Sequence, residues 1–156
     1  MTAQRPRTCR CACGATGFQT SGAALFRILC HCTICQRFNE ADYADVVVYG
    51  AASVERPPAN TVAFATYKPP PNVQRGKCAK CGQPAIEVFE APLLPKLTIV
   101  PFAMHGDPAG LPAPCGHIFY DKRRADADDD LPKHEGFLRS QLAFGKHLLA
   151  SRRAGR

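Results

Sequence analysis

The sequence predicts a mainly β fold, built of short strands, held together by bound metal and followed by a C-terminal helix. Apolar residues alternate in short segments, and 14 prolines and 12 glycines among 156 residues separate these segments by turns. Seven of the nine cysteines form three motifs with Cys-x-Cys or Cys-x-x-Cys spacings, which are typical of metal sites. From Pro132 onward, the apolar spacing changes from a strand period to a helical one.

The predicted strands are runs of alternating or β-branched residues that end near glycine or proline. Residues 25–29 alternate and lead into a group of three cysteines, and residues 45–49 are rich in valine and end at Gly50. A third run stops at three consecutive prolines, which cannot continue the hydrogen bonding of a sheet. The expected strands cover residues 25–29, 45–49, 61–68, 84–90, 96–102 and 117–120.

The C-terminal part of the sequence predicts a loop and then a helix. Asp126 to Asp130 is an acidic run, for which we expect a solvated loop. After it, leucine and phenylalanine recur near helical spacing, Pro132 suits the first turn, and arginines at the end match the helix dipole. We expect this helix over about residues 132–152, as an extension of one domain that covers residues 1–156.

The cysteine pattern favours metal binding over disulfides. The count is odd, and the first residues lack the apolar run of a secretory signal peptide. Paired cysteines at these spacings are typical of metal sites in a reducing compartment. No apolar run approaches the roughly 18 residues that a membrane-spanning helix needs. We therefore expect a cytoplasmic protein that has no membrane partner.

The formal charge of +7 at pH 7 invites a nucleic-acid-binding interpretation. Seven ionised cysteines would remove seven positive charges and two Zn²⁺ ions would restore four, which leaves +4. Much of the remaining charge lies near the two ends of the chain, and basic residues are not interleaved with aromatic ones as base stacking requires. We expect no nucleic-acid partner, and a nucleic-acid-binding zinc ribbon is the less favoured alternative.

Two separated motifs predict one structural zinc site. Cys11-x-Cys13-Gly has the shape of a zinc knuckle, in which glycine lets the backbone turn and point its N–H groups at sulfur. Cys78-x-x-Cys81-Gly has the same character. A lone Cys-x-x-Cys also fits a thioredoxin-like redox pair, but no βαβ pattern surrounds this one. We expect the four cysteines of the two motifs to share one zinc ion, with Cys9 as a spare thiol.

The remaining motif, Cys30-His-Cys32-Thr-Ile-Cys35, places three thiols within six residues. Such ligands hold Zn²⁺ at ~2.3 Å, and one turn of backbone can close all three around one ion. The segment leaves the fourth tetrahedral position open, as in catalytic zinc sites. The alternative is a structural site whose fourth ligand lies elsewhere, for example Cys115, which otherwise is a free thiol in a turn. We expect His31 to orient the site rather than to bind the ion.

In their order along the chain, these motifs resemble the glutathione-dependent formaldehyde-activating enzyme (GFA) family. The resemblance covers residues from about 8 to about 121, includes all seven family cysteines, and places His117-Ile118 where the family usually carries a His-Ile pair. It implies the Mss4-like fold, a set of small coiled antiparallel sheets. It also implies two zinc ions per chain, a structural one at Cys11, Cys13, Cys78 and Cys81, and a more labile one at Cys30, Cys32 and Cys35.

The resemblance implies an enzyme that joins glutathione and formaldehyde as S-(hydroxymethyl)glutathione, formally a carbon–sulfur lyase running in reverse. Its partners would be a small thiol and a small aldehyde. Zn²⁺ with three thiolates carries a charge of −1, so it polarises a carbonyl poorly but holds a further thiolate well. We therefore expect Cys30, Cys32 and Cys35 to be catalytic, with a substrate thiol entering the fourth position and ionising there.

Two arginines beside the cysteine motifs, Arg37 and Arg75, are expected to receive the carboxylates of a glutathione-like thiol. The alternative is that both are surface charges. The alternative function is a non-catalytic Mss4-like zinc-binding module, with both zinc ions structural and another protein as its partner.

Overall fold

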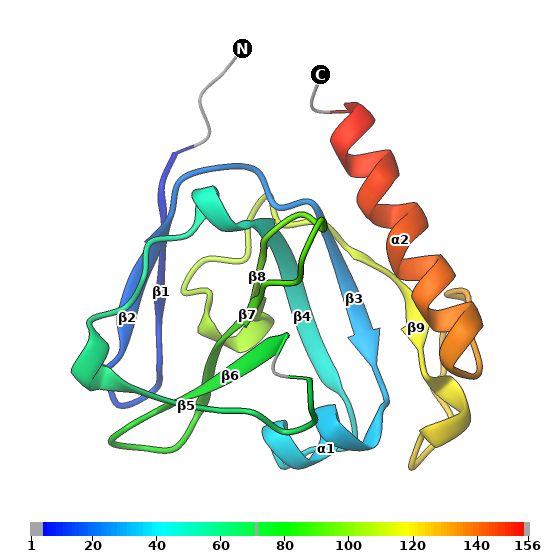
Figure 1. Cartoon of the computed structure of the whole chain (residues 1–156), viewed down its shortest axis with the longest axis horizontal. Helices are drawn as coiled ribbons and strands as arrows, with labels where there is room; N and C mark the ends of the chain where they lie inside the picture. The colour runs from blue at the N-terminus through cyan, green and yellow to red at the C-terminus, as the bar shows by residue number, and fades with distance from the viewer. Residues whose placement is uncertain (1–4, 71, 155–156) are drawn as a thin grey trace.

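The computed structural model describes residues 5–70 and 72–154 of the chain. In that part, nine strands and two α-helices follow one another (Figure 1). The strands are β1 (Arg7–Arg10), β2 (Gly17–Thr20), β3 (Phe26–Cys30), β4 (Ala44–Gly50), β5 (Val62–Ala65), β6 (Val73–Cys78), β7 (Pro84–Phe89), β8 (Leu97–Pro101) and β9 (Pro114–Ile118). The helices are α1 (Thr33–Asn39) and α2 (Phe137–Ala154). The mainly β fold with a C-terminal helix is therefore confirmed.

The strands form two sheets. β1 and β2 pair as an antiparallel hairpin, and the other seven form one sheet in the order β5-β6-β7-β8-β4-β3-β9. Neighbouring strands in the large sheet are antiparallel except β3 and β9, which run parallel with Cys30 opposite Ile118. Because parallel strands end at the same edge of a sheet, β9 delivers the residues after it next to the three-cysteine motif.

Each face of the large sheet carries an apolar core. Successive side chains of a strand point to opposite faces, and β4 shows this clearly. Val47 and Tyr49 belong to the core on the side of the β1–β2 hairpin, whereas Val46 and Val48 belong to the core on the side of α2. The first core also contains cysteines of the hairpin and of β6, and the second contains cysteines of the three-cysteine motif. Each face therefore holds one of the predicted metal sites.

Helix α2 lies alongside β3 and β9, on the opposite side of the molecule from the β1–β2 hairpin (Figure 1). Phe144 meets Phe26 of β3 edge to face, with ring centroids 5.0 Å apart. Near the end of the helix, Ser151 Oγ donates a hydrogen bond to the Leu25 carbonyl oxygen at 2.6 Å. These contacts fix one side of α2 on the sheet, and several leucines on its other side are exposed.

The predicted helix is present, but the expectation that Pro132 occupies its first turn is wrong. α2 begins at Phe137, after Gly136, whose φ of +83° favours glycine. Residues 132–134 instead run beside β9: the Pro132 carbonyl oxygen accepts a hydrogen bond from the His117 N–H at 2.8 Å, and the His134 N–H donates to the His117 carbonyl oxygen at 2.9 Å. The backbone of this segment is therefore used to extend the sheet.

Some predicted strands have other bounds in the structure. The strand expected over residues 61–68 covers only Val62–Ala65. The strand expected over residues 117–120 covers Pro114–Ile118, and it ends there because Phe119 adopts a left-handed conformation with φ 53°. One of the three prolines after β5, Pro71, lies outside the described residues, as do residues 1–4 and 155–156. Within the described part of the chain, no helix is both long and apolar enough to cross a membrane.

Candidate metal centres

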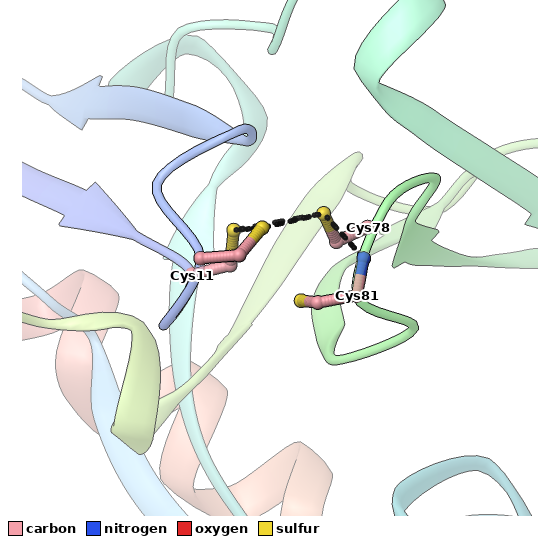
Figure 2. A group of neighbouring side chains, drawn as sticks. Cys11, Cys78 and Cys81 are labelled. Carbon is pink, nitrogen blue, oxygen red and sulfur yellow. Dashed lines mark hydrogen bonds between the residues drawn. The ribbon is translucent and has the colours of Figure 1, made fainter.

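The first candidate metal centre, called the outer cluster, consists of Cys11, Cys13, Cys78 and Cys81. The first two cysteines lie in the turn between β1 and β2, and the other two lie at the end of β6 and in the turn after it. Figure 2 shows the two turns facing each other, with the sulfurs of Cys11 and Cys78 between them. All four sulfurs lie within 4.8 Å of one another. The structure therefore brings together all four cysteines predicted for this site.

Backbone N–H groups point at the sulfurs of the outer cluster. The Thr16 N–H donates to Cys11 Sγ at 3.3 Å, and the Cys81 N–H donates to Cys78 Sγ at 3.5 Å. The hydrogen bond from Cys81 is the main reason why the pKa of Cys78 is lowered to about 5. Thiolates are the form in which cysteine binds metal, so these donors favour metal binding.

The sulfur spacing of the outer cluster fits a metal ion rather than a disulfide. Cys11 Sγ lies 3.4 Å from Cys13 Sγ and 3.6 Å from Cys78 Sγ. A disulfide needs ~2.05 Å, and all nine cysteines are free thiols. Tetrahedral Zn²⁺ with sulfur ligands at ~2.3 Å places the sulfurs roughly 3.8 Å apart, close to the spacing found here. The donor set and its spacing therefore fit zinc at this centre.

The second candidate centre, called the inner cluster, consists of Cys30, Cys32 and Cys35. Cys30 ends β3, Cys32 is the N-cap residue of α1, and Cys35 lies in the first turn of that helix. As N-cap, Cys32 Sγ accepts a hydrogen bond from the Cys35 N–H at 3.3 Å, in the manner of an oxygen cap. The three sulfurs lie within 4.8 Å of one another, and that of Cys32 lies 3.4 Å from that of Cys30. These positions fit three ligands of one metal ion.

The thiols of the inner cluster differ in acidity. Hydrogen bonds from Cys30 and Cys35 lower the pKa of Cys32 to about 3, and the positive charge of Arg75 acts in the same direction. Hydrogen bonding to Cys32 raises the pKa of Cys30, and hydrogen bonding to Cys30 raises the pKa of Cys35. Cys32 is also the most exposed of the three, the other two being buried. Cys32 is therefore the sulfur of the cluster that is both most acidic and most accessible.

The two arginines expected to bind carboxylates lie near one aromatic ring. The guanidinium carbons of Arg37 and Arg75 lie 5.4 Å and 5.9 Å from the ring centroid of Tyr67. Arg37 is exposed on α1, whereas Arg75 is partly buried and its Nε donates to the buried carboxylate of Glu87 at 2.7 Å. Burial raises the pKa of Glu87, and Arg75 opposes that rise. Arg37 is the freer of the two arginines for a ligand.

His31, which lies between two cysteines of the inner cluster, forms a hydrogen-bonded pair with His117 of the His-Ile pair. His31 Nε2 lies 2.8 Å from His117 Nδ1, and both rings are buried. His117 Nε2 donates to Asp129, which belongs to the acidic run expected to be a solvated loop. The ring of His31 is therefore directed to His117, and it does not belong to the group of sulfurs. Sequence analysis missed Asp129, because its neighbours in the run are also aspartates.

The two remaining cysteines lie outside both clusters. Cys9 is fully buried in β1, and burial raises its pKa to about 11, which fits the interpretation as a spare thiol. Cys115 lies in β9, half-buried against the core on the side of α2, rather than in a turn. Burial raises its pKa as well. Within the described residues, the group of sulfurs in the inner cluster has no fourth member.

These features define a class of small, mainly β proteins with two groups of cysteines arranged for metal binding. Residues 6–122 match the family model described as "Glutathione-dependent formaldehyde-activating enzyme". The chain belongs to this family, as the cysteine motifs predict. All seven cysteines of the two clusters lie within the matched residues, whereas Asp129 and α2 lie beyond them.

A comparison with solved structures supports the fold. A crystal structure of a protein from Rhodobacter sphaeroides, a structural genomics target, matches with a TM-score of 0.51 and 17% sequence identity. The match covers 67% of this chain and 97% of that one, and at this identity it is evidence for the fold alone. A comparison with curated proteins finds no match.

Proposed function

We propose that the protein adds a small thiol, such as glutathione, to a small aldehyde, such as formaldehyde, at a zinc ion held by the inner cluster. The observation that carries this proposal is the contrast between the two clusters. The outer cluster has four sulfurs, enough to complete a tetrahedral site, whereas the inner cluster has three within the described residues. A site with three protein ligands leaves room for a substrate thiol, and family membership supports the same chemistry.

The outer cluster is proposed to be the structural zinc site. Its four cysteines come from two turns that are far apart in the sequence, so an ion there would tie the β1–β2 hairpin to the end of β6. Apparent binding free energies of about 10–16 kcal/mol for structural zinc are comparable with the whole stability of a typical domain. A metal ion at the outer cluster would therefore contribute to the stability of the fold.

A zinc ion at the inner cluster would supply a soft cation that lowers the pKa of an incoming thiol. The protein itself holds three sulfurs on the end of β3 and the first turn of α1, two elements that pack in the core on the side of α2. Cys32 is partly exposed, which leaves this side of the cluster accessible to a substrate. In the overall reaction, the thiol loses its proton, a carbon–sulfur bond forms, and the former carbonyl oxygen gains a proton. No oxidant or reductant is needed.

Arg37 and Arg75 are proposed to bind the carboxylates of the thiol substrate. Both lie against Tyr67, and Arg75 is close enough to the cluster to lower the pKa of Cys32. Arg75 is already paired with Glu87, so Arg37 is proposed as the main contact. A guanidinium group can form two parallel hydrogen bonds with a carboxylate, which lysine cannot reproduce.

The test is the rate of S-(hydroxymethyl)glutathione formation by the zinc-loaded protein, measured by exchange NMR with ¹³C-formaldehyde, because the reaction also proceeds without a catalyst. We expect the protein to accelerate the exchange and Cys32→Ser to abolish the acceleration. Cys115→Ser is the matched control, since Cys115 lies outside both clusters, and it should retain the rate. A protein with zinc in both clusters and no acceleration would contradict the proposal.

A second candidate function is a non-catalytic zinc-binding module that binds another protein. The observation that favours it is the exposed leucine side of α2. If this alternative is correct, glutathione should change neither the melting temperature of the zinc-loaded protein nor the absorption spectrum of its cobalt-substituted form. A substrate thiol that binds the inner metal would change that spectrum, because the cobalt–thiolate bands depend on the ligands.

A further inference from the structure

Residues 123–134, called the C-terminal strap, lie beyond the part of the chain that the family model matches. They nevertheless contact His117 and Gln36, which lie next to the inner cluster. Asp129 Oδ2 accepts a hydrogen bond from His117 Nε2 at 2.9 Å. On its other side, His117 Nδ1 lies 2.8 Å from Nε2 of His31. A continuous chain of hydrogen bonds therefore links the strap to His31, the residue that stands between Cys30 and Cys32 in the sequence.

The backbone of His31 is fixed as well as its ring. Its N–H donates to the Ile118 carbonyl oxygen at 3.0 Å, and its carbonyl oxygen accepts a hydrogen bond from Gln36 Nε2 at 2.8 Å. Gln36 is itself held by the segment after β9, because its Nε2 also donates to the Lys122 carbonyl oxygen and its Oε1 accepts from Arg124 Nε. The family match ends at residue 122, and residues before and after this position therefore hold the loop of the inner cluster.

Asp129 has its own partners, which fix its position. Its Oδ1 accepts hydrogen bonds from the Leu131 N–H at 3.0 Å and from Lys133 Nζ at 3.1 Å. The hydrogen bond from His117 is the main reason why the pKa of Asp129 is lowered to about 2, so the group is a carboxylate at neutral pH. His31 and His117 are only 3% and 1% exposed. Removing a hydrogen-bond partner of such a buried polar group lowers the stability of the protein.

We propose that Asp129 is a positioning residue for the inner cluster. Through His117, it holds the ring of His31, and with it the relative positions of Cys30 and Cys32 that a metal ion requires. This inference rests on the proposed metal site at the inner cluster and does not depend on thiol addition. Groups that orient the surroundings of a metal site typically change metal affinity by about 10–100-fold when they are removed.

The test is a titration with Co²⁺ of the wild-type protein and two matched variants, Asp129→Asn and Asp126→Asn. Asp126 lies in the same strap but is exposed and pairs with Arg123. We expect Asp129→Asn to weaken Co²⁺ binding at the inner cluster about tenfold or more and to leave the outer cluster unchanged. Asp126→Asn should change neither. The hydrogen-bonded imidazole N–H signal of His117 in the NMR spectrum should also be lost in Asp129→Asn alone.

Equal Co²⁺ affinity of Asp129→Asn and the wild type at the inner cluster would overturn the proposal. Equal weakening at both clusters would also overturn it, because it would indicate a general loss of stability. If Asp129→Asn does not fold, Lys133→Met removes one partner of Asp129 without changing His117, and a smaller loss confined to the inner cluster is expected. No loss in that variant would count against the proposal. The titration measures metal binding, so it remains valid where thiol addition is not observed.

A separate observation concerns the solvent-facing side of α2. Leu138, Leu142 and Leu149 are 58–68% exposed, and with Gly145 they follow the 4-3-4 spacing of a coiled-coil seam. A side chain built at Gly145 would meet no neighbouring atom, so another backbone can approach closely there. These four residues are called the α2 seam. The seam is narrow, as in a coiled coil, whereas helices that lie on a membrane bury a wider apolar face.

All formal charges on α2 are positive, since the helix contains arginine and lysine but no aspartate or glutamate. Arg139, Lys146 and Arg153 recur every seven residues along one flank of the seam. A second copy in antiparallel orientation would place these cations opposite one another, which is repulsive. A parallel copy would place them opposite Gln141 and Leu148, which offer no charge. Acidic flanks on a different helix are the complement of this pattern.

We infer that the α2 seam binds an amphipathic helix of another protein, with leucine or isoleucine in its seam and glutamate or aspartate on its flanks. The probe is a synthetic three-heptad helix with leucine in the seam and glutamate on both flanks, and the control has lysine in place of glutamate. We expect the acidic helix to bind, with an affinity that falls between about 50 mM and about 300 mM salt. Leu142→Glu should weaken this binding at least tenfold.

Each alternative occupant has its own outcome. Equal binding of the acidic and basic helices, or no binding of either, would overturn the inference. Stronger binding of the protein to phosphatidylserine vesicles than to the acidic helix would assign the seam to a membrane surface instead. Self-association that Leu142→Glu removes would assign it to a second copy of the chain. Leu142 is largely exposed, so the variant is expected to fold.

Discussion

Cys9 and Cys11 show how strongly the role of a thiol depends on its surroundings. The two residues are neighbours in the same alternating row at the end of β1. Cys9 is fully buried, and burial raises its pKa to about 11. Cys11 accepts a hydrogen bond from the Thr16 N–H and lies 3.6 Å from Cys78 Sγ. Cys11 is therefore placed as a ligand, whereas Cys9 serves as a small apolar side chain.

Cys11→Ala and Cys9→Ala form a matched pair that tests this difference. We expect Cys11→Ala to lose one equivalent of zinc and several kcal/mol of stability, because an incomplete outer cluster would hold the metal poorly. Cys9→Ala should keep its zinc and lose only about 1 kcal/mol, through the cavity left in the core. Metal content and thermal unfolding measure both effects. Equal zinc content in the two variants would contradict the assignment of Cys11.

His105 should make stability depend on pH. Burial lowers the pKa of His105, whose Nε2 lies 2.8 Å from the Tyr49 hydroxyl oxygen. A histidine in the unfolded chain titrates near ~6.5, so as the pH falls below this value the unfolded state takes up the proton first. The free energy of unfolding therefore decreases as the pH falls from about 7 toward 5. The decrease should be smaller in His105→Gln, measured by urea unfolding at several pH values.

The same measurement isolates His105 from other acid-sensitive groups. His31 and His147 also have lowered pKa values, and metal-bound thiolates take up protons in acid. These contributions are common to the wild type and His105→Gln, so the difference between the two curves reports His105. Parallel curves over the whole pH range would show that the burial of His105 has no effect on the pH dependence of stability.

Helix α2 is attached to the sheet along one side only. Phe144 and Leu148 pack against the core next to β3, and the opposite side carries the α2 seam. The helix therefore gains stabilising contacts with the sheet through one side only. This arrangement also makes neighbouring positions of one helix respond differently to the same substitution.

Phe144→Ala and Leu142→Ala should differ in stability. Phe144→Ala removes an edge-to-face contact with Phe26 and half-buried apolar surface. We expect it to lower the free energy of unfolding by about 2–3 kcal/mol. Leu142 is largely exposed, so its replacement should change stability by at most about 0.5 kcal/mol. Denaturant unfolding of the two variants measures the difference. Equal costs would mean that the exposed side of α2 is covered in solution.

Strands with an alternating pattern could be predicted from the sequence, and those formed by motif residues could not. The valine-rich run of β4 is unmistakable because β-branched residues fill both of its faces. β1, β2 and β6 consist largely of polar residues, cysteine and glycine, and they become strands by pairing with the next strands along the chain, β1 with β2 and β6 with β5 and β7. Helix α1 could not be predicted either, because it has only seven residues and starts at the cap formed by Cys32.

The cysteine clusters could be predicted because ligand spacing is a local property of the sequence. The hydrogen bonds around the inner cluster could not, because they depend on the parallel pairing of β3 with β9. That pairing brings His117 beside His31 and carries the strap to the same place. In the sequence, Asp129 is one of several aspartates in an acidic run, and only the fold distinguishes it from Asp126 and Asp128.

The large sheet divides the molecule into two halves with one cysteine cluster each. The outer cluster belongs to the core shared with the β1–β2 hairpin, and the inner cluster belongs to the core shared with α2. Loss of metal from one face therefore need not disturb the packing of the other. We also expect the four sulfurs of the outer cluster to bind a metal ion more firmly than the three of the inner cluster, because each further thiolate adds a bond.

A chelator should remove metal in two steps. We expect the inner zinc to leave first, with little change in circular dichroism, because its ligands lie within one short segment of sequence. The outer zinc should leave at higher chelator concentration together with unfolding, because it joins two distant turns. Zinc release followed with a coloured indicator, in parallel with circular dichroism, measures both steps. A single step for release and unfolding would contradict the division into a structural and an exchangeable site.

The outer cluster joins residues that are made at different times. Cys13 and Cys78 are separated by 65 positions, whereas the inner cluster is complete by residue 35. A chain that emerges from the ribosome therefore presents five thiols of the two clusters before Cys78 and Cys81 have been synthesised. The first pair would have to wait for Cys78 and Cys81, and zinc captured early by a mixed set of sulfurs would have to be exchanged before the outer cluster could form.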